Sequence, residues 1–476
     1  MPQHDSRTTG DRPSFIRKTW TLWRAALRGD TEDFTTGPIG TAVFLLSVPM
    51  VLEMALESVF AVTDIFFVAQ LGADAVAAVG LTEAVITLLY AVAIGLSMGT
   101  TAMVARRIGE KKADDAATVA GQALWVGFFT SVFVGLLGYF FAPDILRFMG
   151  ASEAVVEIGS GYTLWLLGGS LTITWLFVIN AIFRGAGDAT IAMRSLWLAN
   201  GVNIVLDPLL IFGVGPFPEL GVTGAAVATT IGRGVGVAYQ LWMLAHGSRH
   251  LRMRLRHLRP VGSVLSRLLR VSAGGVMQFL IGTSSWMILA RIVAEYGSAA
   301  VAGYTIAIRV IIFTIMPAWG MSNAAATLVG QNLGAGKPER AERSVWICMR
   351  YNVTFMILVA VLFLAAAPVI LAVFSDDPAV VRYGVDCLRI LSLGYACYGV
   401  GMVSIQALNG AGDTDTPTVI NFFAFWTFQI PLAWWLAHSW GMGPHGVFIA
   451  VPAAETVLAI AALWMFRVGK WKRRVV

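Results

Sequence analysis

The sequence has 476 residues, of which 57% are hydrophobic and 13% are charged. Soluble globular domains carry about 25% charged residues, so this composition excludes an ordinary water-soluble protein and indicates one that lies mostly in lipid. Lysine and arginine number 34 against 28 acidic residues, which gives a formal net charge of +6. We attribute the excess to membrane orientation and contact with anionic lipid, and we expect no nucleic-acid partner.

The first expected element lies in the tail at residues 1–37. Its segment FIRKTWTLWRAALR, at residues 15–28, places apolar side chains along one helical face with basic residues around them. This pattern is typical of a helix that lies in the plane of the membrane interface. We therefore predict a cytoplasmic tail with an interfacial amphipathic helix.

Long apolar runs follow the tail, and most can cross a hydrocarbon core of about 30 Å as helices. They lack the alternating pattern of barrel strands. We predict an all-α integral membrane protein with twelve spans, at residues 38–69, 75–106, 117–141, 154–184, 189–213, 221–246, 266–294, 298–330, 343–374, 380–408, 416–438 and 445–468.

The connections between these spans differ in charge. Basic residues gather in the tail, in the central stretch SRHLRMRLRHLRP and in the terminal KWKRRVV, whereas the opposite connections hold little beyond Arg147 and Arg382. Cytoplasmic loops carry the excess of lysine and arginine in membrane proteins. We predict a multi-pass protein of the cytoplasmic (inner) membrane with both termini in the cytoplasm.

The two halves of the sequence are related by a repeat. GAGD at residues 185–188 recurs at 410–413, an offset of 225 (410 minus 185). The same offset relates further identical pairs, among them Gly72 and Gly297, Gly95 and Gly320, Gly109 and Gly334, and Lys112 and Lys337. We predict two pseudo-symmetric six-helix bundles, an N-lobe at 38–246 and a C-lobe at 266–468, with a basic linker at 247–265 and a basic C-terminus at 469–476. Two such parallel repeats enclose a cleft and give alternating access by rocking.

Departures from the repeat indicate the functional site. Asp64 corresponds to Leu289 and Glu53 to Gln278, so the N-lobe is expected to hold buried acids that the C-lobe lacks. Pro49 lies four residues before Glu53 and can kink the first span.

Polar residues follow one face of the first span and one face of the fifth. The two stripes are Glu53, Glu57 and Asp64, and Asn200, Asn203 and Asp207. On the first span the three acids point within about 40° of one another. A carboxylate at the bilayer centre costs several kcal/mol unless it is hydrated, paired or protonated, so both stripes are expected to face the lobe interior or the cleft. There such acids can bind H⁺ or Na⁺.

Several motifs resemble the multidrug and toxic compound extrusion (MATE) transporters over about residues 38–468. The motifs are VTDIFFVAQLG, FRGAGD, NIVLDPLLIFG, GVTGAAVATTIG and GQNLGAGK. The chain is most similar to the DinF-like prokaryotic branch, because its acids match in the N-lobe while Gln278 stands in a region where the NorM-like branch is expected to have an acid.

The resemblance implies a secondary exporter of cationic or amphipathic organic compounds, driven by inward H⁺ or Na⁺. By motif, the cation-coupling residues fall on Asp64, Asp207, Asn203, Thr229, Asn180 and Tyr162, and a Na⁺ site would use Asp64, Asn203, Asp207 and Thr229. Pro49 matches the bending proline of the first helix. Glu53 and Glu57 depart from the family pattern and are expected to line the cavity, which would make it anionic.

Other interpretations stay open at this point. Asp207 can be a structural acid paired with asparagine, and Asp64 can be an interfacial acid. Glu53 and Glu57 can be partners of a basic side chain from the other lobe. A flippase for a lipid-linked precursor is the alternative function. We expect no cofactor and no enzymatic activity, because the sequence has no HExxH pair, nucleophile elbow or metal-ligand cluster. We expect a monomer in the lipid bilayer.

Overall fold

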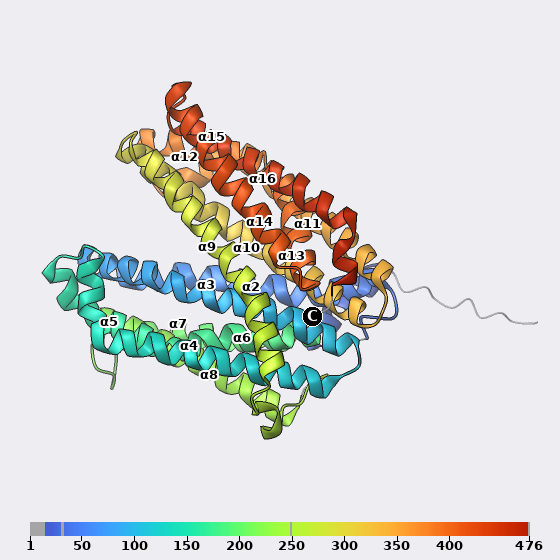
Figure 1. Ribbon diagram of the computed structural model, residues 1–476. Coiled ribbons are helices and arrows are strands. Elements are labelled where there is room, and N and C mark those ends of the chain that lie inside the picture. The colour runs from blue at the N-terminus through green and yellow to red at the C-terminus, as the bar shows by residue number, and fades with distance from the viewer. Residues whose placement is uncertain (1–14, 30–32, 248–249, 475–476) are drawn as a thin grey trace, which may run out of the picture.

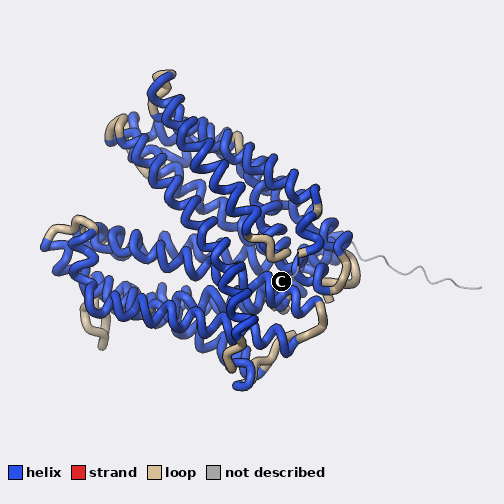
Figure 2. The backbone as a smooth tube through the Cα atoms, viewed as in Figure 1, coloured by secondary structure: helices blue, strands red, loops and turns tan. Residues whose placement is uncertain are grey.

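The described part of the chain is helical and contains no strand (Figure 2). The computed structural model describes residues 15–29, 33–247 and 250–474. The expected tail, linker and C-terminal segment fall partly outside the described residues, at 1–14, 30–32, 248–249 and 475–476. The predicted all-α membrane fold is confirmed.

The helices follow one another with short connections. In the described first half they are α1 (Phe15–Arg28), α2 (Ile39–Ala69), α3 (Ala73–Gly109), α4 (Ala113–Phe148), α5 (Glu153–Gly168), α6 (Ser170–Ala186), α7 (Ala189–Ile211) and α8 (Val222–His246). In the second half they are η1 (Leu255–Leu258), α9 (Gly262–Ala294), α10 (Ser298–Gly334), α11 (Pro338–Ala372), α12 (Pro378–Ser392), α13 (Tyr395–Gly410), α14 (Asp415–Asn421), η2 (Phe422–Gln429), α15 (Ile430–Trp434), η3 (Trp435–Ser439), α16 (Pro444–Val468) and η4 (Lys470–Arg473).

Two of the predicted spans are broken rather than straight. Among the described residues nine helices are long and apolar enough to cross a membrane, and two bent pairs raise the number to eleven. The bent pairs replace the predicted spans at 154–184 and 380–408, since α5 and α6 meet at 41° and α12 and α13 at 55°. The one predicted span that is not among these eleven, at residues 221–246, corresponds to α8, which carries the buried polar residues Arg233 and Gln240.

Both bends occur at a glycine against which another helix packs. A Cβ at Gly169, between α5 and α6, would lie 2.6 Å from the side chain of Thr230 on α8. A Cβ at Gly394, between α12 and α13, would lie 2.7 Å from the Pro452 side chain on α16. The two glycines are related by the 225-residue offset. The bend is therefore a shared feature of the two halves.

The helices form two groups that meet at one end and diverge at the other (Figure 1). The first group, the N-lobe, comprises α2 to α8, and the second, the C-lobe, comprises α9 to α16. Between the lobes, α3 packs on α9 and α10, and α2 packs on α10. The result is a V-shaped molecule whose open end lies opposite the C-terminus.

The lobes touch backbone to backbone at symmetry-related glycines. At the narrow end, a Cβ on Gly109 would overlap the carbonyl oxygen of Gln331, and a Cβ on Gly334 would overlap that of Arg106. The offset of 225 relates Gly109 to Gly334 and also Arg106 to Gln331. The same contact is therefore made twice, once from each lobe.

A second pair of contacts lies further along the same helices. A Cβ on Gly320 of α10 would overlap the carbonyl oxygen of Met50 on α2. Its counterpart Gly95 of α3 lies against Gly275 and Val276 on α9. These glycines set the closest distance between the lobes, because any side chain there would push the helices apart.

Gly334→Ala is expected to destabilise the protein by about 1–3 kcal/mol, because the new methyl group overlaps a backbone atom that cannot move aside. The apparent melting temperature of the purified protein in detergent measures this effect. Gly282→Ala is the matched control, since Gly282 is also helical and has no atom within 4 Å of the added Cβ. An unchanged melting temperature for Gly334→Ala would contradict the assigned contact.

Candidate functional site

A cavity of about 690 Å³ lies between the N-lobe and the C-lobe. Its walls come from α2, α3, α5, α6, α7 and α8 on one side and from α9, α10 and α13 on the other. Aromatic and methionine side chains cover much of it, namely Met54, Phe60, Tyr90, Met98, Tyr162, Phe177, Phe279, Phe313, Met316 and Trp319. A cavity of this size and character suits a drug-sized organic molecule.

The charges around the cavity are mixed rather than purely anionic. Its lining includes four acids, Glu53, Glu57, Asp64 and Glu83, and three arginines, Arg184, Arg233 and Arg309. The predicted acidic stripe of the first span does face the cavity. The expectation of an anionic cavity took no account of the arginines, which leave the lining with only one more acid than base (four minus three).

Glu53 is the most enclosed of the four acids, with 1% of its side chain exposed. Its Oε1 accepts hydrogen bonds from Arg184 Nη1 at 2.8 Å and from Asn180 Nδ2 at 3.0 Å. The partner arginine therefore comes from α6 of the same lobe and not from the C-lobe. Asn180 Oδ1 in turn accepts from Ser195 Oγ at 3.1 Å and from Gln240 Nε2. This network fixes a buried charge beside the cavity wall.

Asp207 lies in a separate cluster together with Asn203 and Thr229. Asn203 Nδ2 donates to Asp207 Oδ1 at 3.2 Å and to Thr229 Oγ1 at 3.1 Å. Asp207 and Asn203 are buried, whereas Thr229 also lines the cavity. Asp207 Oδ2 and Asn203 Oδ1 have no hydrogen-bond partner among the described residues. The cluster therefore offers unsatisfied oxygen atoms just behind the cavity wall.

Asp64 and Tyr162 lie on the cavity surface. Asp64 Oδ1 has no hydrogen-bond partner in the described part of the chain. The charges of Asp64 and Asp207 act on each other, and the charge of Asp64 also acts on Tyr162. The structure thus brings Asp64, Tyr162, Asn203, Asp207 and Thr229 into one region, whereas Asn180 bonds to Glu53 instead.

Four charged cavity residues are absent from the sequence-based site: Glu83, Arg184, Arg233 and Arg309. Each is a charged residue within a predicted span, which is itself an indication of function in a membrane protein. Arg184 also belongs to the FRGAGD motif. Arg233 Nη2 donates to Tyr90 OH at 3.0 Å, and its guanidinium lies 5.7 Å from the centre of the Phe60 ring.

The C-lobe replaces the Glu53 network by neutral amides. Gln278, the counterpart of Glu53, exchanges two hydrogen bonds of 3.1 Å with Asn409. Asn409 also donates to Gln406 at 2.9 Å. The expectation that the C-lobe lacks buried acids is wrong, however. Glu455 of α16 is buried there and is hydrogen-bonded with Tyr398.

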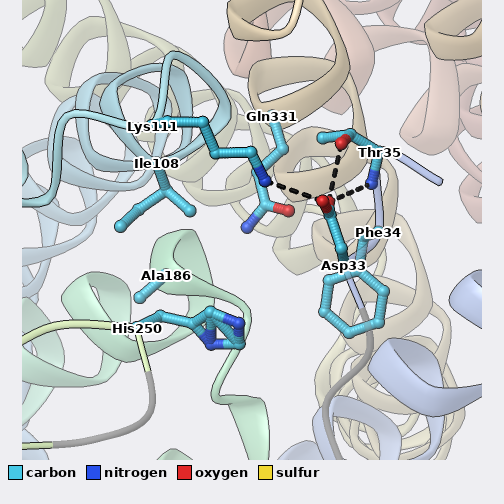
Figure 3. Close-up of a pocket in the computed structure, with 8 residues that line it drawn as sticks. All are labelled: Asp33, Phe34, Thr35, Ile108, Lys111, Ala186, His250 and Gln331. Atoms are coloured by element: carbon cyan, nitrogen blue, oxygen red, sulfur yellow. Dashed lines mark hydrogen bonds and ion pairs between the residues drawn. The ribbon is translucent and has the colours of Figure 1, made fainter.

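The segment at residues 33–37, which we call the N-terminal strap, contacts both lobes through Lys111 and Arg340. In Figure 3, Asp33 points to Lys111 beside a small cavity of about 60 Å³. Lys111 Nζ donates to Asp33 Oδ2 at 2.7 Å. Burial of Asp33 opposes its ionisation, but hydrogen bonds from Lys111 and Thr35 outweigh that and hold the Asp33 pKa at about 2. The Asp33 carboxylate is therefore ionised at physiological pH.

The strap also binds the C-lobe. Arg340, in the first turn of α11, donates to the carbonyl oxygens of Thr36 at 2.6 Å, Gly37 at 2.9 Å and Phe34 at 3.2 Å. Lys337 Nζ donates to the carbonyl oxygen of Thr35 at 2.8 Å. Because Lys111 belongs to the N-lobe, the strap connects the two lobes at the narrow end.

The sequence matches one family model, MatE, in two segments, at residues 49–209 and 276–435. A probable multidrug resistance protein NorM from Thermotoga maritima is 29% identical over 90% of this chain and 93% of its own length. An FAD transporter from Shewanella oneidensis is 26% identical over 92% of this chain and 96% of its own. A solved outward-facing multidrug resistance MATE transporter has a TM-score of 0.87 and 27% identity, over 93% of this chain and 99% of that one.

The chain belongs to the MatE family, the MATE transporters. It is therefore a multi-pass membrane transporter and not an enzyme. The two matched segments fall one in each lobe, as the internal repeat requires.

Arg184→Gln is expected to destabilise the protein by about 3–5 kcal/mol, because the buried Glu53 carboxyl loses its neutralising partner. The double substitution with Glu53→Gln removes both charges and is expected to recover most of that loss. Melting temperatures of the wild type, both single variants and the double variant form a cycle. If the changes in melting temperature of the two single variants simply added up in the double variant, a direct interaction between Glu53 and Arg184 would be contradicted.

Arg340→Gln is expected to loosen the strap, because several carbonyl oxygens lose their donor together. Hydrogen–deuterium exchange of the amides at residues 33–37 is expected to quicken at least fivefold. Arg343→Gln, an exposed position on the same helix with no hydrogen bond among the described residues, is the control. Equal exchange in both variants would show that Arg340 does not hold the strap.

Proposed function

We propose that this protein exports cationic or amphipathic organic compounds in exchange for inward H⁺ or Na⁺. The observation that carries the proposal is a drug-sized cavity between two lobes, with a cluster of unsatisfied acidic and amide oxygens directly behind its wall. The multidrug resistance protein among the relatives supports the substrate class. The organic molecule binds in the cavity, and the ion binds at the cluster.

The coupling ion binds at Asp207, Asn203 and Thr229, with Asp64 nearby. A buried carboxylate without a cationic partner is unfavourable in a membrane protein, so an ion that neutralises it stabilises the loaded state. A proton would supply the missing hydrogen bond at Asp207. Sodium would use the carboxylate, amide and hydroxyl oxygens, which are the hard ligands that such a cation prefers. These oxygen atoms fit both ions, so a transport measurement is needed to identify the driving ion.

Helix α2 connects the ion to the organic substrate. It carries Glu53, Glu57 and Asp64 on the cavity side, and Pro49 removes one hydrogen bond from its ladder. Met50, next to Pro49, is where α2 touches Gly320 of the C-lobe. In the proposed cycle, ion binding changes the bend of α2 at this contact, the organic molecule leaves through the open end, and ion release on the other side restores the cavity.

The open end of the V faces outward in this proposal. Both ends of the described chain lie near the narrow end, together with the basic linker (Figure 1). The positive-inside bias then places the narrow end in the cytoplasm. The likeness to the outward-facing MATE transporter supports this orientation.

Asp207→Asn is expected to lower ion-driven export at least tenfold, because an amide cannot carry the charge to which the ion is bound. Purified protein in proteoliposomes is given a pH gradient or a Na⁺ gradient separately, and export of a fluorescent organic cation is recorded. The gradient that drives wild-type export identifies the ion.

Asp376→Asn, an exposed acid in the connection between α11 and α12, is the matched control and is expected to export as the wild type does. Undiminished export by Asp207→Asn under both gradients would refute the coupling site. Absence of wild-type export under both gradients would refute the antiport itself.

The second candidate function is a flippase for a lipid-linked precursor. The three arginines in the cavity favour it, because an anionic headgroup needs basic partners. Two of these arginines are already bound to Glu53 and Tyr90, so the cavity offers fewer basic groups than acids. We therefore rank drug export first, and lipid flipping without efflux of an organic cation would reverse the order.

A further inference from the structure

Arg309 differs from the other two arginines of the cavity. Arg184 is paired with Glu53, and Arg233 is bonded to Tyr90 and covered by Phe60. Arg309 is exposed to the cavity and forms no hydrogen bond or ion pair with any other described residue. It is therefore the cavity arginine that is free to bind a substrate.

Arg309 begins a stripe of cavity-lining residues on α10. The stripe continues with Ile312, Phe313, Met316, Trp319 and Asn323, at helical spacing. Helix α10 begins at Ser298 at the open end, so Arg309 lies roughly 16 Å along it. On the facing helix α3, Glu83 lies roughly 15 Å from the start at Ala73. The two walls thus carry opposite charges at similar depth, and these charges act on each other.

The free acids and the free arginine lie on different lobes. Glu57, Asp64 and Glu83 belong to the N-lobe, whereas Arg309 belongs to the C-lobe. Phe313 and Trp319 provide aromatic surface on the C-lobe side. A planar aromatic molecule with a basic group at one end and an acidic group at the other can satisfy both walls at once.

Desolvation is what makes Arg309 selective. A molecule that fills the cavity displaces water from the guanidinium, and an unpaired charge without water is costly. A substrate carboxylate replaces that water with charge-assisted, two-pronged hydrogen bonds. An ester of the same shape fills the same space but is a much weaker acceptor. The difference between acid and ester therefore depends on the arginine.

We propose that Arg309 is a specificity-determining residue that binds the carboxylate of amphoteric aromatic substrates and so favours them over their esters. The inference rests on the proposed function in that it takes the cavity as the substrate site. It goes beyond that function because a site for organic cations alone would need no free arginine.

The test compares rhodamine 110, which has a free carboxylate, with rhodamine 123, its methyl ester. Binding of each dye to the purified protein is titrated by fluorescence anisotropy. Arg309→Gln is expected to weaken rhodamine 110 binding at least tenfold and to change rhodamine 123 binding less than twofold. Arg309→Lys keeps the positive charge but cannot form the two-pronged hydrogen bond, so its rhodamine 110 affinity is expected to lie between those of the wild type and Arg309→Gln. Arg291→Gln, an exposed arginine of α9 outside the cavity lining, is expected to change neither.

Equal weakening of both dyes by Arg309→Gln, no change in either, or no binding of either dye to the wild type would overturn the inference. Export of the same dyes from proteoliposomes is measured separately. Selective loss of rhodamine 110 binding without export of either dye would uphold Arg309 and refute the export function. If Arg309→Gln weakened the binding of both dyes equally while the wild type exported them, the export function would be upheld and the role of Arg309 refuted.

Discussion

The structure depends on direct backbone contact between the two lobes at glycine. Gly109 and Gly334 touch the facing helices at carbonyl oxygens, and Gly95 and Gly320 repeat the arrangement further along α3 and α10. Because the contact is made by backbone atoms at glycine, it fixes where the lobes meet. Few side-chain interactions would have to break if one lobe moved against the other. Such a seam can act as a pivot, because packed interfaces shift between discrete arrangements rather than deform continuously. This seam determines where the cavity lies, because the lobes diverge only on the side of the seam that leads to the open end.

The membrane sets the second constraint, which is how charge can be buried. Glu53 is neutralised by Arg184 and Asn180, and its counterpart Gln278 in the C-lobe is neutral from the start. Each of the two acids has one carboxylate oxygen without a hydrogen-bond partner among the described residues, but Asp207 differs in that its recorded partner is the neutral amide of Asn203 and not an arginine. The first arrangement pairs the acid with a cation inside the protein, whereas the second does not. The absence of a cationic partner is the feature on which we base the proposal that Asp207 is the coupling acid.

Composition and apolar runs predicted the twelve-span fold, because a span must be long and apolar whatever its neighbours are. The repeat predicted two lobes, and helical periodicity placed the acids of α2 on the cavity side. The bends at Gly169 and Gly394 could not be predicted, since they depend on α8 and α16 packing from outside the bent pair. The pairing of Glu53 with Arg184 and the isolation of Arg309 also depend on which helices face each other. A lone arginine in an apolar run indicates importance but does not reveal its partner.

The strap at residues 33–37 leads through Pro38 directly into α2. Its hydrogen bonds to Arg340 and Lys337 hold the start of the same helix that carries Glu53, Glu57 and Asp64 further along. The narrow end cannot open without breaking the ties between the strap and one of the lobes. Release from Arg340 and Lys337 would also free the first turn of α2. Access from that side and the positions of the acids would then be linked, because both depend on α2, in which Pro49 lies between the strap and the acids.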